Sequence, residues 1–203
     1  MALQINHLLG RSKHMRPPQR FYEEEFEFDG LIPERWISQA RRLSASADLL
    51  FNAYLKDLHR FGKVRKVSSL KNLEHAMPAT LLYGLALENL LKAILVHNDP
   101  SRTSNGRLAE WPGGGHDLSV LAREAEVALD SVETDLLKRL SQFIKWAGRY
   151  PIPKKAIEMR LVQRAAPEGF LPLPLQENEI PQYQTLFARL ESFAGMTASP
   201  RSV

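Results

Sequence analysis

Apolar side chains recur every three or four residues over several long stretches of this chain, and that spacing predicts amphipathic α-helices. Pro33 suits the first turn of the first helix and Gly62 suits its end, because proline is tolerated at a helix start and glycine beyond a helix end. Ser131 is expected to cap the fourth helix, since Glu133 and Asp135 favour its positive end. The predicted helices are 34–61, 77–97, 117–129, 131–147 and 181–195.

The second of these segments is apolar on nearly every side, which is typical of the central buried helix of a bundle. Its only polar arc holds Glu88, Asn89 and Lys92, and Glu88 and Lys92 have the i,i+4 spacing of a favourable ion pair. This arc either faces water or places Glu88 and Lys92 in a cleft or at a dimer interface. Because no convincing strand pattern occurs, the sequence predicts an all-α bundle of about five helices.

The chain before the first helix has a different pattern. Residues 21–30, FYEEEFEFDG, alternate aromatic and acidic side chains, which predicts that 1–30 form an extended N-terminal arm; a flexible tail is the alternative. A length of 203 residues fits one domain. We therefore assign 31–196 to the helical domain and 197–203 to a disordered tail.

Composition excludes several classes of protein. The chain has no cysteine, which rules out disulfides, thiolate nucleophiles and cysteine-ligated metal sites. Its six histidines are scattered and no HExxH, GxSxG or EF-hand pattern occurs, so we expect neither a metal nor another cofactor. No apolar run approaches the ~20 residues that span a bilayer, and the N-terminus lacks the apolar core of a signal peptide. We expect a cytoplasmic protein without a membrane partner.

Positive charge is concentrated in two stretches that contain no acidic residue. The net charge is +4, and the stretches are 59–71 and 143–155. In the second, cations alternate with aromatic side chains: Lys145, Arg149, Lys154 and Lys155 lie among Phe143, Trp146 and Tyr150. Cations beside aromatic rings suit phosphates and unstacked bases. The alternative is a solvated loop with a hydrophobic anchor.

Three segments occur in an order that is typical of a known family. LLYGLALENLLKAILV contains Glu88 and Lys92, GHDLSVL contains His116, and GRYPIP contains Arg149 and Tyr150. Together they resemble HEPN domains (higher eukaryote and prokaryote nucleotide-binding), whose members typically show an A-x-E-K-x-L-K-A type helix, an H-D-L-x-x-L helix start and an A-R-Y-P element. The resemblance covers roughly residues 35–195.

This resemblance implies a helical bundle that forms a homodimer. Many HEPN proteins are metal-independent endoribonucleases that act as toxins or phage-defence effectors, and others bind nucleotides or work with a small nucleotidyltransferase. It thus implies RNA or a nucleotide as ligand, and a nucleotidyltransferase-type or other protein as partner. Ribonuclease members carry arginine, four to six residues, then histidine, and no histidine of this chain has an arginine at that separation.

A different set of residues can support the same chemistry. Metal-free RNA cleavage needs a base for the 2′-hydroxyl, an acid for the leaving oxygen and a cation beside the phosphate. We assign the catalytic roles to His116 and Arg149, because an imidazole exchanges protons near neutral pH and a guanidinium binds phosphate through paired hydrogen bonds. Substrate-binding roles are assigned to Glu88, Lys92, Lys145, Tyr150, Lys154 and Lys155.

These assignments have structural alternatives. His116 can serve only to cap its helix, Arg149 can pair with Glu88 or cap the carbonyls at the end of 131–147, and Tyr150 can be a packing residue. The sequence predicts an RNA- or nucleotide-directed protein, of the toxin or phage-defence kind, with metal-independent endoribonuclease activity. The alternative is a non-catalytic dimeric module that binds a nucleotide or a partner protein.

Overall fold

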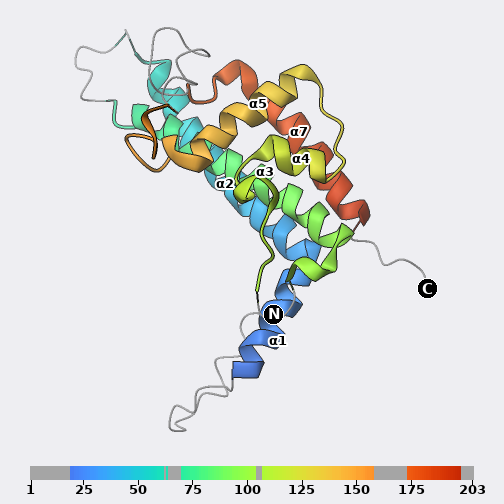
Figure 1. The fold of residues 1–203 in the computed structure, drawn as a ribbon. Coiled ribbons are helices and arrows are strands. Elements are labelled where there is room, and N and C mark those ends of the chain that lie inside the picture. Colours follow the sequence, from blue (N-terminus) through green and yellow to red (C-terminus); the bar gives the residue numbers. More distant parts are fainter. Residues whose placement is uncertain (1–18, 62, 64–69, 104–106, 158–172, 198–203) are drawn as a thin grey trace, which may run out of the picture.

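Helices make up all of the regular structure that is described. The computed structural model describes residues 19–61, 63, 70–103, 107–157 and 173–197, and within these ranges it contains no β-strand (Figure 1). The longer elements are α1 (Gln19–Leu31), α2 (Pro33–Leu58), α3 (Ala76–Asn98), α4 (Leu118–Glu124), α5 (Ser131–Gln142) and α7 (Ile180–Thr197). The predicted all-α bundle is confirmed.

Short helical turns join these elements. The 3-10 turns are η3 (Leu73–His75), η4 (Pro100–Thr103), η5 (Pro112–Gly115) and η7 (Glu177–Glu179), and α5 continues into a π-helical turn, η6 (Phe143–Ala147). The bounds of α2, α3 and α7 agree within a few residues with the predicted 34–61, 77–97 and 181–195.

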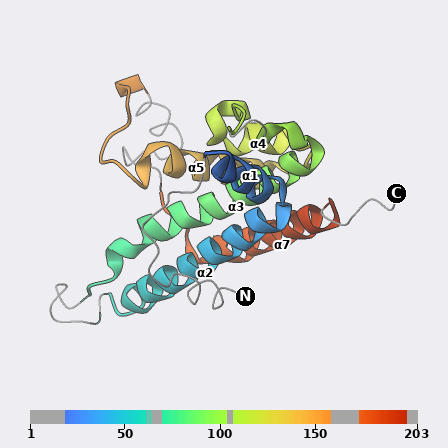
Figure 2. The same ribbon diagram turned by 90° about the horizontal axis from the view of Figure 1, so that it is seen from below.

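Helix α3 runs through the centre of the molecule. Helices α2 and α7 pack along one side of it, and α4, α5 and η6 pack on the other (Figure 2). Most of its apolar side chains are buried, since they occur on every side of the helix. The stretch Leu73–Asn98 is long and apolar enough to cross a bilayer, but 78% of its most apolar window is buried inside the bundle.

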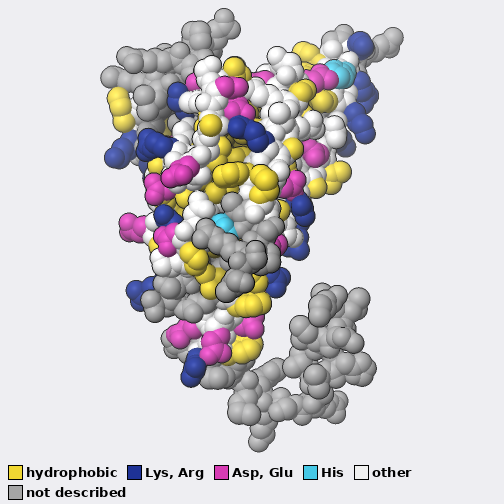
Figure 3. Space-filling view, turned by 90° about the vertical axis from the view of Figure 1, so that its right-hand side faces the viewer, with side chains coloured by type: hydrophobic (Ala, Val, Ile, Leu, Met, Phe, Trp, Pro, Cys, Tyr) yellow, Lys and Arg dark blue, Asp and Glu magenta, His cyan; other side chains and the backbone are white. Residues whose placement is uncertain are grey.

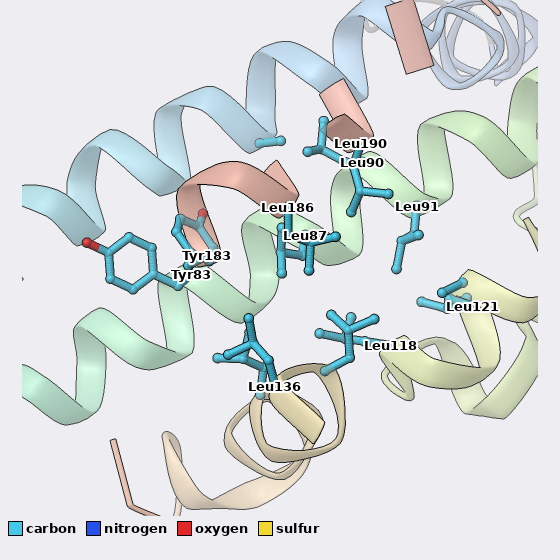
Figure 4. Packing of buried hydrophobic residues seen from close by; sticks show 14 of the residues in the cluster. Tyr83, Leu87, Leu90, Leu91, Leu118, Leu121, Leu136, Tyr183, Leu186 and Leu190 are labelled. Atoms are coloured by element: carbon cyan, nitrogen blue, oxygen red, sulfur yellow. The ribbon is translucent and has the colours of Figure 1, made fainter. Parts of the chain in front are cut away.

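Leucine side chains from several helices meet around α3. Figure 4 shows Leu87 and Leu90 of α3 between Leu186 of α7 on one side and Leu118 of α4 and Leu136 of α5 on the other. Leu87, Leu90, Leu118 and Leu186 are completely buried. One continuous core thus holds all of these helices together.

Residues 19–31 form a helix, so the predicted extended arm is wrong for this part of the chain. An extended segment would need a neighbouring strand for its backbone hydrogen bonds, and the described residues form none, whereas a helix forms these hydrogen bonds within one segment. Arg20 and Glu24 also form an i,i+4 ion pair with Nε and Oε1 2.8 Å apart. Residues 1–18 and 198–203 lie outside the described residues.

Helix α1 extends beyond the end of the bundle (Figure 1). Its Phe21, Tyr22 and Phe28 are exposed. In Figure 3 acidic, basic and apolar side chains lie beside one another at this lower end of the molecule, and charges of both signs are also mixed over the rest of the face that is shown. The helix is held to the bundle mainly at its C-terminal end, where Trp36 Nε1 donates a hydrogen bond to the carbonyl of Gly30 at 3.0 Å.

The ends of α4 and α5 differ from the sequence expectation. Asp130, not Ser131, caps α5, because its Oδ1 accepts a hydrogen bond from the backbone NH of Glu133 at 2.7 Å and the Glu133 side chain accepts one from the NH of Asp130. Helix α4 ends at Glu124 instead of 129, since Glu126 adopts a left-handed conformation (φ 55°) that no helix continues.

The burial of α3 can be tested with a matched pair of leucine substitutions. Leu87→Ala should lower the free energy of unfolding by about 2–5 kcal/mol, because it opens a cavity at a fully buried position. Leu49→Ala, on α2 at a residue that is 75% exposed, should change it by less than about 0.5 kcal/mol. Urea unfolding measures both variants, and equal losses would contradict this packing.

Candidate functional site

A buried ion pair on α3 meets a histidine that precedes α4. Lys92 Nζ lies 2.5 Å from Glu88 Oε1, and His116 Nδ1 lies 3.0 Å from Glu88 Oε2. The side chains of Glu88 and Lys92 are only 7% and 10% exposed, whereas that of His116 is 42% exposed. Glu88 and Lys92 therefore do not face water. We call Glu88, Lys92 and His116 the polar cluster.

The contact with Glu88 sets the orientation of the imidazole. A carboxylate paired with an ammonium can only accept hydrogen bonds, so Nδ1 of His116 carries the hydrogen that it donates to Glu88. In a neutral imidazole the other nitrogen, Nε2, then keeps its lone pair. The His116 side chain is 42% exposed, and Nε2 forms no hydrogen bond with the residues that the structure describes. This arrangement can accept a proton from a bound molecule.

Trp111 covers the ammonium of Lys92. Its ring centre lies 5.2 Å from Lys92 Nζ, and Trp36 packs edge-on against it with ring centroids 5.7 Å apart. The Arg102 guanidinium approaches the same ring at 5.9 Å. A buried ammonium needs compensation for its lost water. Here Glu88 supplies the opposite charge and Trp111 supplies an aromatic face.

Three consecutive glycines let the chain turn from Trp111 to His116. Residues 113–115 all have positive φ, at 63°, 68° and 78°. A Cβ on Gly115 would lie 3.2 Å from Trp111 Cβ and 3.5 Å from Lys92 Nζ, so the backbone itself passes close to the buried ammonium. Only glycine adopts this conformation without strain. The glycine run thus brings both flanking side chains onto the polar cluster.

Polar contacts with α5 and η6 fix the start of α4 next to His116. Asp117 caps α4 by accepting a hydrogen bond from the NH of Val120 at 3.3 Å, and its other oxygen accepts one from Lys145 Nζ at 2.7 Å. The NH of Leu118 donates to Ser141 Oγ at 2.9 Å. His116 does not cap the helix, since Asp117 does.

Two opposing effects set the pKa of Asp117. Burial disfavours the charged carboxylate, but the hydrogen bond and positive charge of Lys145, together with the backbone NH groups of Val120 and Ser119, outweigh it. The pKa of Asp117 therefore lies below its usual range. At neutral pH its negative charge holds Lys145 beside the polar cluster.

The basic segment begins in the π-helical turn η6. Arg149 donates a hydrogen bond from Nη2 to the carbonyl of Lys145 at 3.0 Å, and its guanidinium lies 5.4 Å from the ring centre of Tyr150. Through this hydrogen bond Arg149 caps the end of the helix, and it does not pair with Glu88. Both side chains are exposed, so Tyr150 is not a packing residue. A π turn re-aims the side chains at a helix end.

The structure brings only some of the predicted site residues together. Glu88, Lys92 and His116 are in direct contact, and Lys145 joins them through Asp117. Arg149 and Tyr150 contact each other one turn further on, where Arg149 binds the backbone carbonyl of Lys145 rather than the imidazole of His116. Lys154 and Lys155 are exposed and follow the buried Pro153.

Sequence reasoning missed the roles of Trp111, Asp117 and Ser141. Asp117 carried a usable signal, because aspartate before an apolar run is a preferred N-cap. Trp111 and Ser141 carried none, since their contacts join segments that are distant in sequence.

Comparison with known proteins adds no further assignment. No protein-family model, curated protein or solved structure matches this chain. In the part of the chain that the structure describes, no group of three or more His, Cys, Asp or Glu side chains is placed to hold a metal ion. The chemistry of the site is therefore inferred from its own residues.

The ion pair on α3 predicts a non-additive response to substitution. Glu88→Ala should lower the free energy of unfolding by about 3–5 kcal/mol, because it leaves the Lys92 ammonium buried without its partner. The double variant Glu88→Ala, Lys92→Met should recover part of this loss, since it removes both charges. Urea unfolding of the three proteins checks this, and a double variant less stable than Glu88→Ala would contradict it.

The Asp117–Lys145 pair predicts a pH-dependent contribution to stability. Because folding lowers the pKa of Asp117, its charge stabilises the fold above the unfolded value of 3.8, and this contribution is lost as the pH falls through the lower native value. Asp117→Asn keeps a capping side chain but removes the charge. Both partners are about a third exposed, so the wild type should be more stable than Asp117→Asn by less than about 1 kcal/mol at neutral pH.

Urea unfolding between about pH 2 and about pH 7 measures this difference, which should vanish at the acidic end. Asp135→Asn is the control, since Asp135 forms an exposed ion pair with Lys138 and does not cap a helix. A difference between the wild type and Asp117→Asn that does not change with pH would contradict the prediction.

Proposed function

We propose that this chain is an RNA-directed protein that cleaves RNA without a metal ion, with His116 as the proton acceptor. The observation that carries the proposal is the hydrogen bond from Nδ1 of the partly exposed His116 to the buried Glu88, which leaves Nε2 as the free nitrogen of a neutral ring. A carboxylate that orients an imidazole in this way is a recurrent element of general base catalysis.

In the proposed reaction, Nε2 of His116 removes the proton from a 2′-hydroxyl. The 2′ oxygen then attacks the adjacent phosphorus, the bond to the 5′ oxygen breaks, and the proton returns to that oxygen directly or through a water molecule. The products are a 2′,3′-cyclic phosphate and a 5′-hydroxyl. Lys92 contributes through its ion pair with one oxygen of Glu88, whose other oxygen contacts the ring.

The cations of the basic segment provide a binding path for the phosphate backbone. Lys145 connects the two regions, because its ammonium pairs with the residue after His116 and its carbonyl accepts the hydrogen bond from Arg149. Exposed Arg149 and Tyr150 suit a phosphate and an unstacked base, respectively. Lys154 and Lys155 extend this positive charge along the path proposed for the RNA strand.

The resemblance to HEPN domains supplies the biological setting of the proposal. We place the protein in the cytoplasm as a homodimeric toxin or phage-defence component, with a nucleotidyltransferase-type or other protein as its partner. The second candidate is a non-catalytic module that binds RNA, a nucleotide or a protein. It is favoured by one observation, the position of Arg149 on the Lys145 carbonyl and on Tyr150 rather than on the polar cluster.

Cleavage of a structured RNA pool in excess EDTA tests the proposal. The wild type should cleave, and His116→Ala should be slower by about 100-fold or more, because general base catalysis contributes at least that much. Arg149→Ala should cleave less efficiently through weaker phosphate binding. His59→Ala is the matched control, since His59 is also exposed and pairs with a glutamate, Glu177, at 2.9 Å; it should retain full activity.

The other outcomes decide between the two candidates. RNA binding without cleavage, with an affinity that falls steeply as salt rises, would favour the binding module. Cleavage that His116→Ala and His59→Ala affect equally would remove the polar cluster from the mechanism. Neither cleavage nor binding by a folded wild-type protein would overturn the RNA proposal as a whole.

A further inference from the structure

A groove opens between α2 and the start of α7, on the side of α3 that faces away from α4. Its volume is about 360 Å³, near the lower end of the range of small-ligand sites. It is lined by Asp48, Phe51 and Leu55 of α2, Tyr83 of α3, and Ile180 and Pro181 of α7. Two carboxylates, Asp48 and Glu177, and the amides Asn52 and Gln184 also line it, so the groove combines apolar walls with acidic and neutral polar groups.

The carboxylate of Asp48 is held in place but its charge is not neutralised. The Tyr83 hydroxyl, which Figure 4 shows pointing toward α2, donates a hydrogen bond to Asp48 Oδ1 at 2.7 Å. Burial and the neighbouring Asp48 raise the pKa of Tyr83 well above its usual range, so the hydroxyl keeps its proton and remains a donor. Asp48 forms no ion pair with any residue that the structure describes.

The remaining polar groups make the groove suitable for a cation. Glu177 also lines it, and among the residues that the structure describes its ion-pair partner is the exposed His59. Among the described residues that line the groove there is no lysine or arginine. The charge of the site is thus negative, and a negatively charged ligand would be repelled.

The chemistry of the walls indicates an organic cation. A hard metal ion requires several oxygen ligands, and no cluster of metal-binding side chains occurs among the described residues. The rings of Phe51 and Tyr83 can attract an ammonium group, and Leu55 and Ile180 provide apolar surface for a methylene chain.

We propose that this groove binds a primary ammonium group carried on an aliphatic chain, with the ammonium at Asp48. Two molecules share this chemistry, a free linear diamine and the lysine side chain of another protein. The site is independent of the proposed ribonuclease activity, because its residues differ from those of the polar cluster and lie on another side of α3.

Titration of the full-length protein with two probes tests the proposal. The probes are 1,5-diaminopentane and N-acetyl-lysine-N-methylamide, and the readout is the change in backbone amide chemical shifts. We expect saturable binding with a dissociation constant on the order of 1 mM, at residues around the groove. The probe that binds more tightly identifies the source, the diamine indicating a small molecule and the lysine derivative a protein partner. The neutral analogue 1-pentanol should bind at least tenfold more weakly.

Variants of the groove separate specific binding from general attraction of cations. Asp48→Asn keeps an acceptor for Tyr83 but removes the charge, and should weaken binding at least tenfold. Asp135→Asn, at an exposed position of α5, should leave it unchanged. Gln184→Lys places a competing ammonium at an exposed residue of the groove, so it should block binding even if Asp48→Asn fails to fold. Absence of saturable binding, or equal binding by the wild type and either groove variant, would overturn the proposal.

Discussion

The burial of α3 on all sides is the constraint on which the rest of the structure depends. A polar side chain on such a helix cannot reach water, so it needs a partner from the segment that covers it. Thr80 accepts a hydrogen bond from the NH of Leu175, Tyr83 donates to Asp48 of α2, and Glu88 binds His116. Each of these three polar groups thus attaches one surrounding segment, and the same contacts that satisfy the helix position other parts of the chain.

Both candidate sites follow from this constraint. The hydrogen bond of Glu88 orients an imidazole that is partly exposed, and the hydrogen bond of Tyr83 orients a carboxylate in an open groove. The two sites differ in charge because a basic side chain lies near one and an acidic side chain near the other. Lys145 stands next to the polar cluster through Asp117, whereas Glu177 lies beside the groove. One central helix therefore positions both the polar cluster, for which we propose a phosphate ligand, and the groove, for which we propose an ammonium ligand.

Sequence periodicity predicted the long helices and the Glu88–Lys92 pair, because both depend on spacing within one segment. It missed features that depend on contacts between segments. Alternation in 21–30 indicated an extended arm, but no partner strand exists in the described chain and Arg20 pairs with Glu24 along a helix. The position of Arg149 depends on the π turn, which inserts a residue that helical periodicity does not reveal. Trp111 reaches Lys92 only through the left-handed glycine turn.

The segments that meet α3 at the polar cluster depart from regular helix. The glycines at 113–115 bring His116 to Glu88, and the π turn η6 brings Lys145 to Asp117. Such departures in a protein that is otherwise regular are expected at functional sites, because they cost stability that packing elsewhere must supply. Glu88 serves both stability and orientation, since it holds the buried Lys92 as well as His116. His116 is partly exposed, and the charge of Glu88 is already paired with Lys92, so replacing His116 tests the proposed chemistry with the least effect on folding.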